Sequence, residues 1–171
     1  MRPRLPLFAV CLLVCLSALQ PVFAAQCTLT PVAIQPVGAE PAEQYVGSAQ
    51  GVEFRFHNDK RELPVSVFPE PPLEVVHSST RQACEIKQGG VWVREHVYVN
   101  RDASVLVTHE YSGSNDALNF YNTQTCQRVA SLDVSGARWA IQPGAIVVRR
   151  LTGNWAVRHL KLNSACLPSG R

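Results

Sequence analysis

The residue types in this chain that could carry out chemistry are five histidines, thirteen carboxylates and six cysteines. His109 and Glu110 stand close to the hydroxyl of Ser112, a combination that nucleophilic hydrolases use. Adjacent residues of a strand point to opposite faces, so this triad is a weak candidate. The sequence contains no Gly-x-Ser-x-Gly elbow and no glycine-rich phosphate loop before a helix. We therefore predict no catalytic residues and a protein that is not an enzyme.

The cysteines favour disulfides over a metal site. Four of them lie beyond position 24, and all four are disulfide candidates: Cys27, Cys84, Cys126 and Cys166. They are widely separated, with no CxxC or HxxxH spacing, so we predict no metal and no cofactor. A Cys27–Cys166 disulfide would tie the two ends of the chain together, and Cys84–Cys126 would follow by elimination. The distance between equivalent points of neighbouring repeats can exceed the ~4.4 to 6.8 Å that separates the Cα atoms of a disulfide. The connectivity is therefore left open.

Residues 1–24 have the features of a cleaved secretory signal. Arg2 and Arg4 precede an apolar run over residues 7–19, and Val22-Phe23-Ala24 places small residues at a cleavage site. Residues 1–24 are therefore predicted to be a signal peptide, and the remaining soluble chain is expected in the periplasm without membrane insertion. Removal of Arg2 and Arg4 leaves that chain nearly neutral, with one more basic than acidic residue. With no basic run along it, we expect no nucleic-acid partner and no anionic membrane partner.

The elements that must position any site repeat along the chain. The spacing from Cys84 to Cys126 nearly equals that from Cys126 to Cys166, and both are close to the roughly 40 to 45 residues of a four-stranded propeller blade. Each repeat contains an alternating apolar segment, a turn, a valine-rich segment, a break and a third apolar segment. No long helical pattern interrupts the repeats. We predict three blade-like repeats in one β domain, at residues 52–95, 96–136 and 137–171, with the last repeat lacking its outer strand. Residues 25–51 are predicted to be an N-terminal arm with one helical turn near residues 40–45.

The predicted fold is all-β, with three antiparallel four-stranded sheets arranged as a partial, three-blade propeller. The alternative is a β-sandwich, because regularly spaced turn signals between short strands also fit that architecture. In a meander, the breaks between the second and third strands of each repeat lie at one end of the assembly. Those breaks are Pro69–Pro72, Ser112–Asp116 and Thr152–Asn154, with Trp155 as either an aromatic anchor or a core residue.

The best candidate for a binding loop is the second break. It combines two hydroxyls, a glycine and an asparagine in a slim tip that is able to enter a narrow cleft. The predicted partner-binding residues are Ser112, Gly113, Ser114, Asn115 and Asp116. The alternative is an ordinary solvated hairpin turn, because the same residue types dominate turns in general.

The residues around this loop resemble a known family. The segments 109–115, 118–123 and 132–135, together with Cys126, are similar to periplasmic immunity proteins that neutralise a type VI secretion amidase effector. The resemblance implies binding to a peptidoglycan-cleaving, cysteine peptidase-like amidase with a Cys/His active site. It also implies that the hydroxyl of Ser112 or Ser114 bonds the catalytic histidine of the enzyme. Periplasmic lysozyme inhibitors use a similar Ser-Gly-Ser loop. A small-ligand binder and a structural envelope protein are the remaining alternatives.

Overall fold

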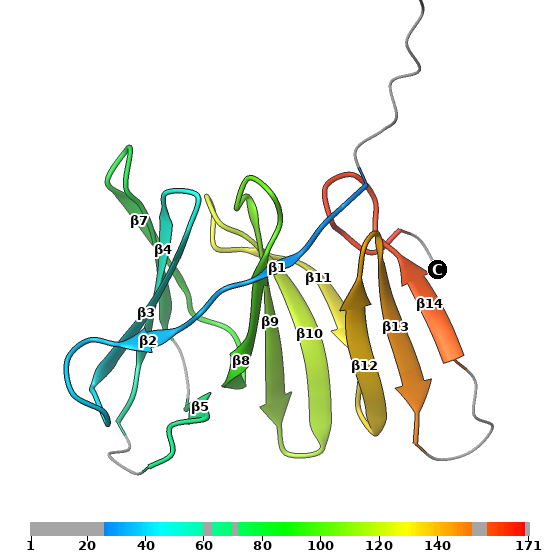
Figure 1. Cartoon of the computed structure of the whole chain (residues 1–171), viewed down its shortest axis with the longest axis horizontal. Coiled ribbons are helices and arrows are strands. Elements are labelled where there is room, and N and C mark those ends of the chain that lie inside the picture. Colours follow the sequence, from blue (N-terminus) through cyan, green and yellow to red (C-terminus); the bar gives the residue numbers. More distant parts are fainter. Residues whose placement is uncertain (1–25, 60–62, 70–71, 152–156, 170–171) are drawn as a thin grey trace, which may run out of the picture.

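The structure is a computed structural model that describes residues 26–59, 63–69, 72–151 and 157–169. These residues form fourteen strands and contain no helix, which confirms the predicted all-β class. The strands make three antiparallel sheets that lie side by side along the longest axis of the molecule (Figure 1). Within the described ranges, no helix has the length and apolar character needed to cross a bilayer. The predicted signal peptide, residues 1–24, lies outside the described residues.

The first sheet, called here the N-terminal sheet, has five strands in the order β2-β3-β4-β6-β7. Their bounds are β2 Gln35–Pro36, β3 Gln44–Ala49, β4 Val52–His57, β6 Leu73–His77 and β7 Gln82–Ile86. In β4 the side chains of Phe54 and Phe56 are buried while Arg55 is exposed. This alternation is the period-two pattern of a strand with one face on a core.

The central sheet has the strand order β1-β8-β9-β10-β11, and a short strand, β5, also pairs with β8. The bounds are β1 Thr30–Pro31, β5 Val67–Phe68, β8 Val91–Val99, β9 Val105–Ser112, β10 Asn115–Asn122 and β11 Arg128–Asp133. Strand β9 is buried on both faces from Val105 to Thr108. A strand covered on both sides reads as a continuous apolar run, which explains the sequence Val-Leu-Val in β9.

The C-terminal sheet has three strands, β12 Ala137–Gln142, β13 Ala145–Arg150 and β14 Val157–Lys161, in that order. In β12, the alternation turns Trp139 and Ile141 inward and leaves Arg138 and Ala140 exposed. Within the described residues, this sheet therefore has no fourth strand.

Two apolar clusters cover the two faces of the central sheet. On one face, Trp92, Leu106 and Tyr121 pack in a cluster with Phe54 and Phe56 of the N-terminal sheet. The cluster on the other face includes Val107, Leu118 and Phe120 of the central sheet together with Ile146 and Val148 of the C-terminal sheet. Each fully buried side chain of this size contributes about 1.5–3 kcal/mol relative to exposure. The strands of the central sheet are consequently held between two cores.

The two disulfides have the connectivity that the sequence suggested and left open. Cys27–Cys166 has a Cα–Cα distance of 5.1 Å and links the N-terminal strand region to the C-terminal loop. Cys84–Cys126 has a Cα–Cα distance of 5.8 Å and links β7 to the turn between β10 and β11. The second bridge therefore joins the N-terminal sheet to the central sheet.

Several details of the predicted organisation were wrong. The sheets have five, six and three strands instead of four each. The arm is not a plain connector, because β1, β2 and β3 all lie within residues 25–51, and no helical turn is present near residues 40–45. The boundary expected at residues 95/96 falls inside β8. The two shared cores are also compatible with the β-sandwich alternative, and the three-blade propeller arrangement stays a prediction.

Candidate functional site

The predicted loop is the tip of the hairpin that joins β9 to β10. The two strands pair over all eight residues, from Val105 with Asn122 to Ser112 with Asn115. Only Gly113 and Ser114 remain as a two-residue turn. Gly113 has φ +60°, which is the conformation of the first central residue in a type II′ turn, and a Cβ atom added to it would have no atom beyond its chain neighbours within 4 Å. This turn matches the right-handed twist of the strands, so the tip continues the sheet without splaying it.

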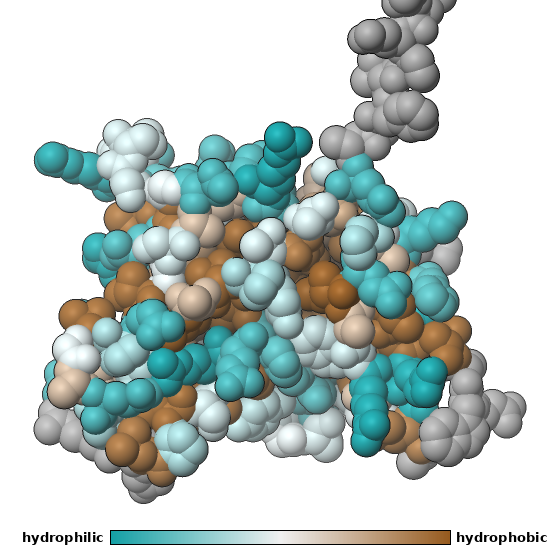
Figure 2. All heavy atoms as spheres, in the orientation of Figure 1, coloured by the Kyte–Doolittle hydropathy of each residue, from teal (hydrophilic) through white to brown (hydrophobic). Residues whose placement is uncertain are grey.

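The hairpin projects from the lower edge of the central sheet in the view of Figure 1. Ser112, Gly113, Ser114 and Asn115 are exposed. Figure 2 shows pale and teal atoms over this edge below β9 and β10, as expected for a tip of glycine, serine and asparagine. The first of the three breaks predicted at this end begins just after β5, whereas residues 70–71 and 152–156, including Trp155, lie outside the described residues. The structure thus brings four of the five predicted residues together at an accessible tip.

Asp116 lies directly behind the tip, in the second residue pair from the turn. Its side chain is half-buried, and its carboxylate accepts a hydrogen bond from Nε2 of His109. Its backbone is held by the neighbouring turn, because its N–H donates to Oγ of Ser135 at 2.9 Å and its carbonyl accepts from the N–H of Val134 at 2.8 Å. Asp116 therefore fixes the position of the hairpin instead of extending its tip.

A cluster of rings supports the hairpin beside Asp116 from the side of the C-terminal sheet. The Nδ1 atoms of His96 and His109 are 3.0 Å apart, so one ring donates to the other. Both rings contact Trp139 edge to face, with centroid distances of 4.9 Å and 5.1 Å. Burial, with a smaller contribution from the charge of His109, lowers the pKa of His96 below its ordinary value of 6.5. The neutral form of His96 is the form that this packing favours.

This histidine cluster was not predicted from the sequence. The register of β8 against β9 shifts between Trp92 and Val97, and this irregularity decides that His96 lies beside His109. Trp139 belongs to a different sheet, the C-terminal one. Residue spacing along the sequence predicts neither the register shift nor the contact with Trp139. The only hint was the presence of two histidines within strand-like segments.

The opposite face of the hairpin holds a buried carboxylate. Glu110 is 3% exposed and accepts hydrogen bonds from the hydroxyls of Thr108 and Tyr121 and from the N–H of Gly90. Burial, followed by the charge of Glu110, raises the pKa of Tyr121 above its ordinary value of 10.0. His109 and Glu110 thus point to opposite faces, as strand alternation predicted. Among the described residues neither bonds the hydroxyl of Ser112.

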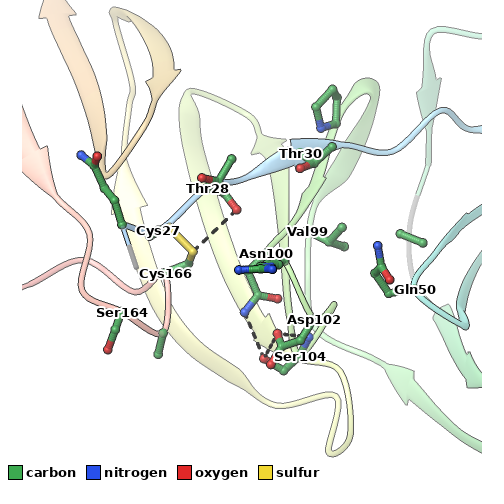
Figure 3. A pocket seen from close by; sticks show the side chains of 15 residues that line it. Cys27, Thr28, Thr30, Gln50, Val99, Asn100, Asp102, Ser104, Ser164 and Cys166 are labelled. Carbon is green, nitrogen blue, oxygen red and sulfur yellow. Dashed lines mark hydrogen bonds between the residues drawn. A yellow bond between two sulfur atoms is a disulfide. The ribbon is translucent and has the colours of Figure 1, made fainter. Parts of the chain in front are cut away.

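A cavity of about 950 Å³ lies at the other end of the central sheet (Figure 3). The Cys27–Cys166 disulfide and the turn between β8 and β9 line it. The polar groups of that turn bond one another: Nδ2 of Asn100 donates to Oγ of Ser104 at 3.0 Å, and Ser104 donates to Asp102 at 2.7 Å. Those side chains organise the turn, so the exposed hairpin is the stronger candidate site.

Together, the three sheets define a small disulfide-bonded β protein with an exposed two-residue hairpin turn between β9 and β10. Residues 27–157 match the family described as "Immune protein Tsi1". The protein "Immune protein Tsi1" from Pseudomonas aeruginosa is 35% identical to this chain over 119 residues, which is 69% of each chain. The chain therefore belongs to the Tsi1 immune protein family. This membership confirms the resemblance to type VI secretion immunity proteins drawn from the sequence.

Proposed function

We propose that the chain is a periplasmic immunity protein that binds a type VI secreted peptidoglycan amidase and blocks its catalytic cleft with the β9–β10 hairpin. The observation that carries the proposal is the two-residue Gly113-Ser114 tip, exposed at the end of strands that are themselves buried. Membership of the Tsi1 family supports the immunity role over a lysozyme inhibitor, a small-ligand binder or a structural envelope protein.

The geometry of the hairpin supports inhibition by occlusion. Eight paired residues and the contacts of Asp116 with Ser135 and Val134 hold the tip before binding. A preorganised loop loses little conformational entropy in a complex, so more of its contact energy appears as affinity. The hydroxyl of Ser112 or Ser114 can replace a water molecule hydrogen-bonded to the catalytic histidine of the amidase. Such an inhibitor needs no chemistry of its own, in agreement with a protein that is not an enzyme.

Two features support export to the periplasm. Residues 1–24 have the charge and hydrophobic pattern of a signal peptide. The four remaining cysteines form two disulfides, and disulfides persist in oxidising compartments. The periplasm, where peptidoglycan lies, is a compartment of this kind.

The test is a bulky substitution at the tip. Ser114→Arg adds a long side chain to an exposed position, so we expect it to abolish inhibition of the cognate amidase in a muropeptide-release assay. The matched control is Gln124→Arg, which adds the same side chain to an exposed turn at the other end of β10. Both variants should keep the melting temperature of the unaltered chain. Full inhibition by Ser114→Arg would exclude the hairpin as the blocking element.

A further inference from the structure

The charge of the chain is distributed unevenly. From Val134 to Arg171 there are six Lys and Arg residues and not one Asp or Glu. Residues 25–133 instead carry eight basic and thirteen acidic residues. The near-neutral total therefore conceals a basic C-terminal sheet beside an acidic remainder.

Strand register concentrates the arginines at one end of the C-terminal sheet. Arg138 of β12 pairs directly opposite Arg149 of β13, and Arg150 and Arg158 occupy the adjoining pairs. All four residues are exposed. Because successive residues of a strand point to opposite faces, Arg138 and Arg149 share one face of the sheet, and Arg150 and Arg158 lie on the other. Arg138 and Arg149 are called here the arginine cluster. Figure 2 shows teal atoms over the lower ends of β12 and β13, where β13 ends and β12 begins. Within the described part of the chain, none of the four forms an ion pair.

The arginine cluster is next to the hairpin. The turn between β11 and β12 contacts both: the N–H of Val134 donates to the carbonyl of Asp116, and the carbonyl of Gly136 accepts from the N–H of Leu151 at 3.0 Å. Asp116 lies directly behind the hairpin tip, and Leu151 follows Arg149 and Arg150 of β13. The lower ends of β12 and β13 also lie at the same end of the molecule as the hairpin in Figure 1. A partner that receives the hairpin at this end is therefore within reach of the cluster.

The pairing of two arginines lowers the stability of the protein when no partner is bound. Like charges directly opposite each other on neighbouring strands are destabilising, and Arg138 and Arg149 are such a pair. The carboxylate of Asp133 accepts from the N–H of Ser135 and lies near Arg150. Among the described residues, neither Arg138 nor Arg149 forms an ion pair. A partner that brings negative charge would offset this repulsion.

We infer that the arginine cluster is a second contact surface for the effector and that it recognises an acidic patch beside the effector's catalytic cleft. This inference rests on the proposed function, and it adds the charge of the partner surface. Complementary charge around an interface raises the association rate more than it changes contact packing. The hairpin then blocks the cleft, and the cluster accelerates and orients docking.

The experiment compares Arg138→Gln/Arg149→Gln with a control of equal charge change, Arg81→Gln/Arg101→Gln, which alters exposed turn residues of the other two sheets. Association with the purified cognate amidase is measured by stopped flow from low to physiological salt. We expect the cluster variant to associate on the order of tenfold more slowly at low salt, with a flatter salt dependence, and the control to differ little. Its melting temperature should be equal to or above that of the unaltered chain, because a repulsive pair is removed.

Three results would overturn the inference. The first is an association rate and salt dependence of the cluster variant equal to those of the control. The second is arginine-dependent binding to phosphatidylglycerol vesicles with unchanged amidase association, which would assign the cluster to a membrane surface. The third is absence of amidase binding by the unaltered chain, which would overturn the proposed function and the acidic patch with it. In contrast, slow association with intact final inhibition would separate the cluster's role from that of the hairpin.

Discussion

At the scale of single residues, the tip depends on one glycine. The turn requires a backbone conformation at position 113 that residues with a Cβ atom adopt at a cost, although the space around Gly113 is open. Ser114 and Asn115 beside it have no such requirement, since neither has a positive φ. Backbone preference, and not crowding, therefore explains why a glycine stands between two serines.

This residue-scale argument predicts the effect of Gly113→Ala. The substitution should lower the free energy of unfolding by about 1–2 kcal/mol, because alanine is strained at φ +60°. Ser114→Ala is the matched control and should leave the unfolding free energy within about 0.5 kcal/mol of the unaltered chain. Urea denaturation measures both. Equal stability of the two variants would contradict the assignment of a type II′ turn.

At the scale of elements, the hairpin is bonded to a histidine cluster just behind its tip. His109 bonds Asp116 of the hairpin on one side and His96 on the other, and Trp139 of the C-terminal sheet packs on both rings. The groups that influence His96 are His109, Glu95 and Asp116. The hairpin is therefore connected to the C-terminal sheet through histidines, the residue type whose charge changes near neutral pH.

The lowered pKa of His96 predicts how stability varies with pH. In the unfolded chain a histidine binds a proton below about pH 6.5, whereas the folded state keeps His96 neutral to lower pH. The unfolded state thus binds more protons, and stability falls as the pH drops below about 6.5. We expect the free energy of unfolding to decrease from pH 7 to pH 5, with a shallower decrease in His96→Gln.

The control for this titration is His159→Gln, which removes an exposed histidine of β14 and should keep the slope of the unaltered chain. Asp102 and Asp133 also have lowered pKa values, chiefly because of hydrogen bonds from Ser104 and Ser135. Their contributions are lost only at pH values below about 4, so they do not interfere with the window used here. Identical slopes for His96→Gln and the unaltered chain would show that His96 does not govern this range.

At the scale of the whole molecule, two disulfides hold the three sheets in place. The Cys27–Cys166 bridge closes a loop of 139 residues, and the Cys84–Cys126 bridge closes one of 42 residues. Longer loops lose more entropy in the unfolded chain when they are closed. The bridge near the two ends of the described chain should therefore contribute more than the bridge between sheets.

Removal of each bridge tests this order. Cys27→Ala/Cys166→Ala should lower the free energy of unfolding by about 5 kcal/mol, and Cys84→Ala/Cys126→Ala by about 4 kcal/mol, in the chain-entropy model. Guanidinium denaturation of the two double variants measures the difference. A larger loss from the shorter loop would mean that contacts around Cys84 and Cys126, and not loop closure, dominate.

Much of the fold was predictable from local patterns. Period-two alternation and turn residues indicated β4, β9, β10, β12 and β13, and the loop at Ser112–Asp116 emerged from composition alone. Cysteine spacing indicated repeated units, and it suggested a Cys27–Cys166 bridge but left the connectivity open. Strands β1, β2 and β3 were missed, because their proline- and glycine-containing segments have weak strand preference and pair only with distant partners.

By itself, the sequence determined the all-β class, the polar composition of the hairpin tip and the four cysteines, because these follow from residue type and short-range spacing. Only the tertiary structure decided which residues of different strands meet. A register shift brings His96 to His109, sheet packing adds Trp139, and strand pairing sets Arg138 opposite Arg149. Those contacts depend on the free energy of long-range packing, which local sequence patterns do not predict. The local sequence therefore specifies the hairpin tip, and the tertiary fold specifies the residues packed around it.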